Sequence, residues 1–258
     1  MVNVWQIPEK FPALLADEAH VWRIKISDFI GHLEKFFALL SLQERQRANR
    51  FVFSQDEQSF IIVHGVLRSL LAKYLNIDPK EIRFAVNSHG KPKLVNFNNK
   101  KTGFPACAGN DGQINFNISH SHDMALLAFA KDIEIGVDIE YMKDKVNCID
   151  IARRFFSTRE AAELAKLPKK EQQQAFFHCW ARKEAFIKAI GQGLSFPLRQ
   201  FIVNIDPDEG TDLLLEVDSS KYQANNWSLI ALSVDDQYVA ALATANPINI
   251  LQFSLDFR

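Results

Sequence analysis

The chain lacks the features of several specialised protein classes. It has only three cysteines, Cys107, Cys148 and Cys179, an odd number without metal or redox spacing. This argues against a disulfide scaffold and fits a reducing compartment better. Its net charge of −1 lacks the basic excess that phosphate-tracking surfaces need, so we expect no general binding of nucleic acid.

Long hydrophobic runs are also missing. The longest, Met124 to Ala130, is far shorter than the roughly 20 residues that span a bilayer. The first residues, MVNVWQIPEK, lack a basic stretch followed by an apolar core, so no signal peptide is expected. The 258 residues, 47% hydrophobic and 24% charged, are typical of a globular protein of one large domain or two ordinary ones. We therefore expect a cytoplasmic protein without a membrane partner.

The order strand, helices, strands occurs twice along the chain, with a change near Lys131. The segments Asn115 to Ala130 and Asn226 to Ala243 share a pattern, although few identities. The sequence therefore predicts an α+β fold of two pseudo-symmetric halves, residues 1–131 and 132–258. A ligand between two such halves is an ordinary placement for an active site.

Each half also has a predicted helix start and a long helix. Ser41 with Glu44, and Ser157 with Glu160, are capping-box signatures. Long helices are predicted from about Gln58 to Leu75 and from Gln172 to Ile190, the second ended by glycine.

A short strand, Ile133 to Glu140, brings two carboxylates to one face. Strand residues alternate sides, so Asp138 and Glu140 point together, opposite to the isoleucines and Val137. Carboxylates two positions apart lie roughly 6–7 Å from each other, close enough to share a divalent cation. Taken alone, such a pair is more often a solvated face.

The helix after it reads WARKEAFIKAIGQGL, and Trp180, Glu184 and Lys188 form one stripe at four-residue spacing. Glu184 and Lys188 alone resemble an ordinary surface ion pair. Trp180, with Phe176 and Phe177 beside it, indicates a largely buried helix, where a carboxylate needs a partner or a metal. If strand and helix meet, three carboxylates and a lysine form a plausible site for a Mg²⁺-bound diphosphate.

A third segment, FNISHS, ends a predicted strand with Ser119, His120 and Ser121. A lone histidine there is usually structural, but hydroxyls and strand-end amides beside it could bind phosphate oxygens. The basic residues Arg45, Arg47 and Arg50, and then Lys91, belong to segments that are usually just solvated. Their relevance depends on the rest of the site.

Three segments in order, FNISHS, GVDIE and FFHCWARKEAFIKAIGQGL, resemble the 4′-phosphopantetheinyl transferases of the surfactin-synthetase-activating type. LSLQERQRANRF and the GKP of Gly90 to Pro92 look like the family's N-terminal motifs, so the resemblance covers nearly the whole chain. It implies a monomer that holds coenzyme A and Mg²⁺ between its halves. It implies transfer of the phosphopantetheine arm to a serine of an apo acyl, polyketide or peptidyl carrier protein, releasing adenosine 3′,5′-bisphosphate.

The resemblance also implies roles for single residues. Asp138, Glu140 and Glu184 match the metal ligands, and Glu184 also matches the residue proposed to deprotonate the serine. The matches on coenzyme A are Lys188 at the diphosphate, Ser119 and His120 at its phosphates, Arg47 at the 3′-phosphate, and Lys91. All-oxygen ligands favour Mg²⁺ over Zn²⁺. Beside Glu184, Lys188 and His120 would be catalytic as well, because they add donors at the phosphates as charge develops, and most of the catalysis would be positioning and electrostatics.

Two departures from the family pattern stand out. Ser59 is small and neutral where the family often has a basic residue gripping the 3′-phosphate, so either Arg45 or Arg50 compensates or discrimination is weaker. The loop from Lys100 to Gly112 is longer than the family needs.

Two other functions stay open at the level of sequence. One is a Mg²⁺-dependent hydrolase of coenzyme A-like diphosphates, which would need no carrier. The other is a binding module without catalysis, against which the set Asp138, Glu140, Glu184 and Lys188 argues.

Overall fold

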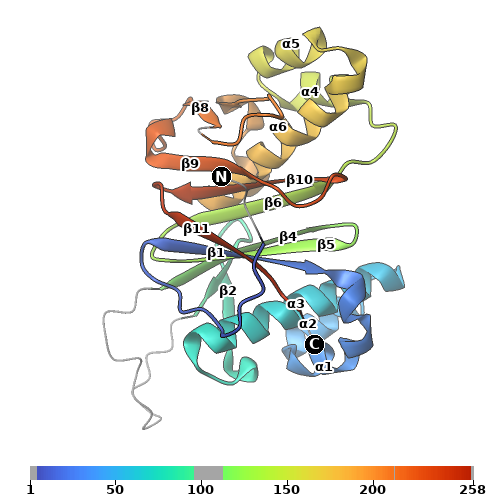
Figure 1. Cartoon of the computed structure of the whole chain (residues 1–258), viewed down its shortest axis with the longest axis vertical. Coiled ribbons are helices and arrows are strands. Elements are labelled where there is room, and N and C mark those ends of the chain that lie inside the picture. The colour runs from blue at the N-terminus through green and yellow to red at the C-terminus, as the bar shows by residue number, and fades with distance from the viewer. Residues whose placement is uncertain (1–4, 96–112, 212, 257–258) are drawn as a thin grey trace.

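The chain folds into four layers, in the order helices, sheet, sheet, helices (Figure 1). The computed structural model describes residues 5–95, 113–211 and 213–256; the predicted Lys100 to Gly112 loop lies outside them. Within these ranges no helix is long and apolar enough to cross a membrane. The helices and strands confirm the α+β class.

The two halves have the same order of elements. The first comprises β1 (Glu18–Lys25), η1 (Ile26–His32), α1 (Leu33–Leu39), α2 (Leu42–Ala48), α3 (Ser54–Leu75), η2 (Pro79–Glu81), β2 (Phe84–Val86), β3 (Pro92–Leu94), β4 (Ile114–Ser121) and β5 (Met124–Lys131). The second comprises β6 (Ile135–Tyr141), α4 (Cys148–Phe155), α5 (Thr158–Lys166), α6 (Lys169–Ile190), η3 (Gly193–Ser195), η4 (Leu198–Gln200), β7 (Phe201–Val203), β8 (Leu214–Val217), η5 (Ala224–Asn226), β9 (Trp227–Leu232) and β10 (Tyr238–Ala245), and β11 (Asn249–Ser254) follows.

Sheet topology repeats as well. The first sheet contains β1, β5 and β4 in that spatial order, and the second contains β6, β10 and β9, all antiparallel. The predicted likeness of the two strand pairs is thus the likeness of β4–β5 to β9–β10. Pseudo-symmetry between the halves is confirmed.

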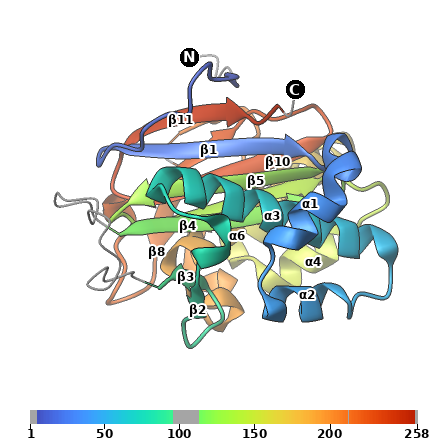
Figure 2. The ribbon, with the colours of Figure 1, turned by 90° about the horizontal axis from the view of Figure 1, so that it is seen from below.

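The strand β11 was not predicted. It returns to the first sheet and runs parallel to β1, with Glu18 opposite Asn249 and Arg23 opposite Ser254. The first sheet therefore takes one edge strand from the end of the chain, and in Figure 2 β11 lies beside β1. A division into independent domains at residue 131 stays a prediction, and any such division must account for this strand.

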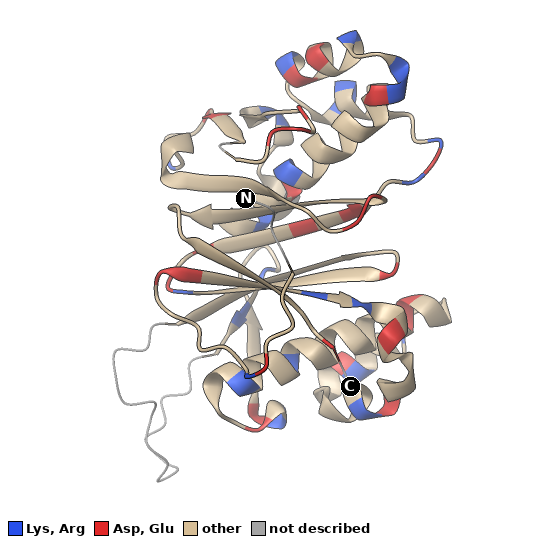
Figure 3. Cartoon of the chain, viewed as in Figure 1, with Lys and Arg blue, Asp and Glu red and all other residues tan. Residues whose placement is uncertain are grey.

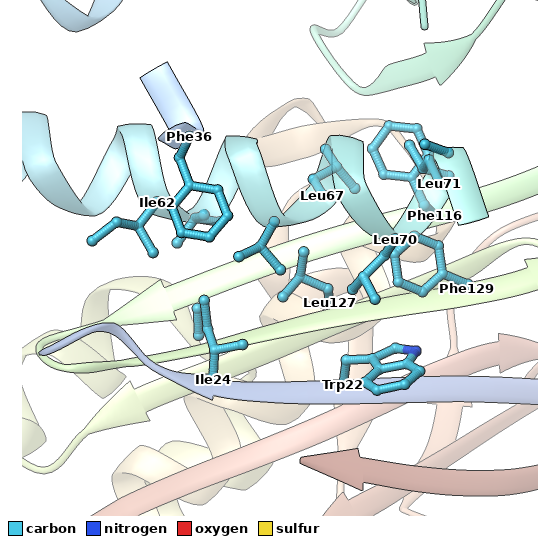
Figure 4. Close-up of a cluster of buried hydrophobic side chains, with 14 of the residues drawn as sticks. Trp22, Ile24, Phe36, Ile62, Leu67, Leu70, Leu71, Phe116, Leu127 and Phe129 are labelled. Carbon is cyan, nitrogen blue, oxygen red and sulfur yellow. The ribbon is translucent and has the colours of Figure 1, made fainter. Parts of the chain in front are cut away.

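Hydrophobic side chains form three clusters between the four layers. Strand alternation sends Trp22, Leu127 and Phe129 toward α3, where they meet Leu67 and Leu70 (Figure 4). The opposite faces of β1 and β5 pack on β6 and β10. The outer face of β10 packs on α6. Lysines, arginines and acids lie mostly on the outer helices and strand ends, whereas the sheets between are largely uncharged (Figure 3).

Both capping boxes are confirmed. Ser41 caps α2 and Ser157 caps α5, each reciprocated by the glutamate three residues on. The two long helices are both 22 residues, and both end at a left-handed residue, Asn76 after α3 and Gly191 after α6.

The two sheets are joined by side chains where the edge strands β4 and β6 meet. Backbone N–H groups of Val137, Ile139 and Tyr141 on β6 donate to side chains on β4: to Asn117 Oδ1 at 2.9 Å, Ser119 Oγ at 3.4 Å and Ser121 Oγ at 3.0 Å. The two-residue period of one strand matches that of the other. Polar side chains thereby satisfy the backbone of a strand edge that has no strand neighbour on this side.

Candidate functional site

The site forms where α6 packs on β6, and Gly136 permits the close approach. A Cβ atom at Gly136 would collide with the backbone of Ala185 and Ala189 on α6. Glycine lets the helix lie directly on the strand. Asp138 and Glu140 share this strand face with Gly136, so the helix brings Glu184 and Lys188 over them.

An ion pair lies at the centre, with the Asp138 side chain buried and the Lys188 side chain 28% exposed. Lys188 Nζ is 2.6 Å from Asp138 Oδ1 and also donates to Ser119 Oγ at 2.9 Å, while Ser119 donates to the same Asp138 oxygen at 2.8 Å. Burial raises the pKa of Asp138, and Lys188 opposes this increase. Asp138 Oδ2 is buried as well, and none of the described residues offers it a hydrogen bond.

The charge of Asp138 affects the pKa of both other carboxylates. The pKa of Glu184 is raised to about 7, mainly by burial and also by the charges of Asp138 and Glu140, against the opposing charge of Lys188. Burial also raises the pKa of Glu140, and the charge of Asp138 adds to it, whereas a hydrogen bond from Ser121 Oγ at 3.2 Å counteracts it. Carboxylates that raise one another's pKa are short of positive charge.

The donor set fits a hard cation. All candidate ligands are carboxylate oxygens, which Mg²⁺ prefers, and the buried Asp138 Oδ2 lacks a partner. As the side chains lie, no three histidine, cysteine or acidic residues in the described ranges are arranged to hold a metal ion. Lys188 instead supplies the positive charge at Asp138. The ligand set Asp138, Glu140 and Glu184 stays a prediction that the chemistry of the site supports.

The other predicted residues lie at different distances from this centre. Ser119 is part of it. His120 comes next on β4, exposed on the opposite side of the strand. Partial desolvation lowers its pKa, and the charges of His64 and Lys188 act in the same direction. Lys91 directly precedes β3, and its side chain reaches the end of α6. Its Nζ contacts Glu134 at 2.9 Å and the carbonyl of Ala189 at 2.8 Å. Burial lowers the pKa of Lys91, and Glu134 opposes this.

Arg47 lies apart from the metal-binding candidates. It is exposed on α2, with its guanidinium 5.1 Å from the ring of Phe60 on α3. Arg45 is turned to carbonyls of Phe37 and Ala38. The predicted coenzyme A contacts of Arg47 and Lys91 stay predictions.

Sequence reasoning missed the hydrogen-bonding role of Asn117 and Ser121, and the partner Glu134 of Lys91. One signal was available. Asn115, Asn117, Ser119 and Ser121 put four polar residues on one face of a strand whose other face is apolar, which indicates a polar partner on that face. The identity of that partner, the edge of β6, depends on tertiary structure.

Fold and site together define an enzyme with two repeated α+β units and an acidic, lysine-containing centre on the second. Comparison with known proteins specifies the family. Residues 134–243 match the model of the 4′-phosphopantetheinyl transferase superfamily, and residues 27–132 match that of the 4′-phosphopantetheinyl transferase N-terminal region. The chain belongs to this family and is a 4′-phosphopantetheinyl transferase of the Sfp type.

Three relatives show how far the similarity extends. The 4′-phosphopantetheinyl transferase HetI of Nostoc sp. is 36% identical over 90% of both chains. The 4′-phosphopantetheinyl transferase Sfp of Bacillus subtilis is 32% identical over 83% of this chain and 86% of that protein. The human L-aminoadipate-semialdehyde dehydrogenase-phosphopantetheinyl transferase is 30% identical over 83% of this chain and 70% of its own length.

Proposed function

We propose that the protein transfers the 4′-phosphopantetheine arm of coenzyme A to a serine of an apo carrier protein, depends on Mg²⁺, and releases adenosine 3′,5′-bisphosphate. The observation that carries the proposal is the ion pair of Asp138 with Lys188, with Glu140 on the same face of β6 and Glu184 one turn before Lys188 on α6, on the half that matches the superfamily model. Such a site suits a diphosphate, whose negative charge needs both a cation and a lysine.

Asp138, Glu140 and Glu184 would hold the metal ion. Bound there, Mg²⁺ supplies positive charge to the diphosphate and so stabilises its leaving oxygen. Lys188 donates from Nζ to a phosphate oxygen, and Ser119 positions that Nζ through the 2.9 Å hydrogen bond. Most of the rate enhancement then comes from positioning and preorganised charge.

Glu184 is the residue suited to accept the serine proton. In the metal-free protein burial, together with the charges of Asp138 and Glu140, raises its pKa to about 7 against the charge of Lys188, so its carboxylate is a stronger base than that of an ordinary glutamate. The serine oxygen forms a bond to the phosphorus that carries the pantetheine. The bridging P–O bond breaks, the electron pair leaves with adenosine 3′,5′-bisphosphate, and the serine proton goes to Glu184.

The test incubates the protein with coenzyme A, Mg²⁺ and each of several apo carriers, and weighs the carriers by mass spectrometry. We expect a mass gain of one phosphopantetheine arm on at least one acyl, polyketide or peptidyl carrier. Release of free phosphopantetheine without a carrier would instead identify a hydrolase. Coenzyme A binding without either product would leave a binding module.

We further propose that the enzyme works as a monomer in the cytoplasm. The cysteine content supports a reducing compartment. Light scattering of the purified protein at several concentrations tests the monomer, and a mass that doubles with concentration would contradict it.

A further inference from the structure

The turn between β2 and β3, residues 87–91, reaches from the first half to the end of α6 in the second. Lys91 Nζ donates to the carbonyl of Ala189 at 2.8 Å. Asn87 Nδ2 donates to the carbonyl of Gly191, also at 2.8 Å. The last carbonyls of a helix have no partner within the helix and need donors from elsewhere, and a positive charge there also complements the helix dipole. Two side chains of the first half therefore cap α6.

The ammonium group of Lys91 has an acceptor for each of its hydrogens. Besides the carbonyl of Ala189, its Nζ lies 2.9 Å from Glu134 Oε2 and 3.3 Å from the carbonyl of Ile135. A lysine ammonium has three N–H donors, which these three oxygens match. The Lys91 side chain is 8% exposed, whereas that of Lys188 is 28% exposed. In this arrangement Lys91 has no hydrogen left to give to a phosphate.

Hydrogen bonds within the turn make it a firm support. Asn87 Oδ1 accepts from the backbone N–H groups of His89 and Lys91, both at 2.9 Å. Asn87 N donates to the carbonyl of Lys91 at 3.0 Å. Gly90 has a φ of +85°, in the left-handed region that glycine adopts without strain. The amide of Asn87 thus closes the turn through its oxygen and holds α6 through its nitrogen.

These contacts lie where α6 packs on β6. Ile135 directly precedes Gly136, the residue that lets the helix approach the strand. Ala189 directly follows Lys188, and a Cβ at Gly136 would collide with its backbone. Because Lys91 binds a carbonyl on each side of this contact, it ties the end of the helix to the start of the strand. The ion pair of Lys188 spans the same contact, so its geometry depends on how firmly the helix end is held.

We propose that Lys91 is a positioning residue, which fixes the end of α6 on β6 and thereby holds Lys188 Nζ at Asp138, where it meets the diphosphate. Asn87 assists by holding the next turn of chain at Gly191. This inference rests on the proposed function, since it concerns the lysine of the same site. It differs from the contact with coenzyme A that the family resemblance implies for Lys91. A contact with the ligand would contribute to binding, whereas a positioning contact contributes to the rate.

A double-mutant cycle of Lys91→Met and Lys188→Met tests the proposal. Single-turnover transfer to an apo carrier and calorimetric binding of coenzyme A are measured, both with Mg²⁺. Lys91→Met removes the ammonium at similar length, and a shift of the helix end of about 1 Å predicts a transfer rate about 10- to 10²-fold lower. In the Lys188→Met enzyme the same change should cost less than about twofold, because the group that Lys91 positions is already gone. The Kd for coenzyme A should stay within about threefold, because the lost interaction acts mainly in the transition state.

Two further variants separate this role from a loss of folding. Asn87→Asp keeps the oxygen that closes the turn and loses the donor to Gly191, so it should lower the rate in the same direction, and it stays informative if Lys91→Met misfolds. Lys93→Met changes an exposed lysine of β3 and should leave the rate and the Kd unchanged. Losses of rate that multiply in the double variant would overturn the positioning role. A Kd raised about tenfold or more at an unchanged rate would do the same, since it would place the ammonium on coenzyme A.

Amide hydrogen exchange follows the helix end without any transfer. The N–H of Gly191, which donates to the carbonyl of Ile187 at 3.0 Å, reports on the last turn of α6. Its exchange should be about five- to tenfold faster in Lys91→Met and unchanged in Lys93→Met. Unchanged exchange in a folded Lys91→Met protein would overturn the proposal. If wild type transferred to no carrier while this exchange became faster, the proposed function alone would be refuted, and the hold of Lys91 on α6 would be confirmed.

Discussion

The two halves share one sheet topology but have different residues at its equivalent positions. In each half the fourth residue of the central strand defines an equivalent position. Leu127 of β5 pairs with Trp22, and Ala241 of β10 pairs with Asp138, so Trp22 and Asp138 are equivalent. By the same register, Ile24 stands where the second half has Glu140, and His20 where it has Gly136. One half thus has packing residues at the positions where the other has its carboxylates.

The helices above show the same contrast. The twenty-first residue is Tyr74 in α3 and Ala189 in α6. Tyr74 bonds His20 Nδ1 at 2.8 Å and Trp22 Nε1 at 2.7 Å, which fills the first half with side chains. Ala189 lies against Gly136 and leaves the neighbouring space to Lys188 and the carboxylates. The comparison teaches that a packed core and an acidic site can occupy equivalent positions of one fold.

The largest expected effect is on catalysis in the second half. Glu184→Gln should lower the transfer rate about 10³-fold, the range of a lost general base, while coenzyme A binding is largely kept. Ser69, the equivalent residue of α3, gives the matched control, and Ser69→Ala should transfer normally. A Glu184→Gln enzyme with the wild-type rate would remove Glu184 from its role.

The buried cations give the next comparison. Glu160 and Lys183 are both 0% exposed and 2.8 Å apart, and Lys183 also donates to the carbonyls of Leu198 and Phe201. Glu160→Gln would leave a buried ammonium without its counter-ion and should cost about 3–5 kcal/mol of unfolding free energy.

The equivalent change in the first half, Glu44→Gln, should cost about 1–3 kcal/mol, because Glu44 is 13% exposed and water can partly replace it at Arg68. Denaturant unfolding of both variants measures the difference. Equal losses would show that the two ion pairs are energetically alike despite their different burial.

Gly136→Ala tests the contact that forms the site. Because the new Cβ would collide with the backbone of α6, the helix must shift, and we expect about 1–3 kcal/mol of destabilisation together with loss of transfer. Gly31→Ala, where a Cβ meets nothing within 4 Å, is the control. A Gly136→Ala protein as stable and active as Gly31→Ala would contradict the close approach of strand and helix.

The smallest expected effect is on the pH dependence of the free energy of unfolding, which one glutamate in each half changes in opposite directions. The folded pKa of Glu184, about 7 against an ordinary 4.5, is raised. In metal-free buffer its contribution is therefore present below pH 4.5 and lost as the pH rises through 7, by about 1–2 kcal/mol once solvent screening is allowed for.

Glu44 behaves in the opposite way. Although burial acts to raise its pKa, the contact with His64 and the hydrogen bonds from Ser41 and Arg68 lower it to about 2. Its contribution is present above pH 4.5 and lost as the pH falls through 2. Denaturant unfolding of wild type, Glu184→Gln and Glu44→Gln from pH 3 to 8 measures both dependences. If the free energy of unfolding of each variant differed from that of wild type by the same amount at every pH, both expectations would be contradicted.

Much of the frame could be predicted from local patterns. The capping boxes at Ser41 and Ser157 are written in four consecutive residues, and the alternation of Ile135, Val137 and Ile139 marks a strand side. Strand β11 was missed because its pairing with β1 joins residues more than 200 positions apart, and no local signal encodes such a partner.

The candidate residues of the site could be named from the sequence, and their roles stay predictions, whereas the contacts among them could not be predicted. The spacing of Glu184 and Lys188 on a helix could be read directly, as could that of Asp138 and Glu140 on a strand. The contacts of Lys188 with oxygen atoms depend on how the two sheets stack. The same holds for the hydrogen bond from Ser119 to Asp138 at the edge of β6. Glu44 on α2 contacts both His64 and Arg68 on α3, and the spacing of residues within either helix does not predict these contacts.

The central claim is that Asp138, the residue equivalent to Trp22, makes the second half the metal-dependent catalytic half. Single-turnover transfer of the phosphopantetheine arm to an apo carrier, followed by intact mass, tests it most directly. We predict complete conversion by wild type with Mg²⁺, none with a chelator present, and a rate at least about 10²-fold lower for a folded Asp138→Asn enzyme. Conversion at the wild-type rate with the chelator, or by Asp138→Asn, would contradict the claim.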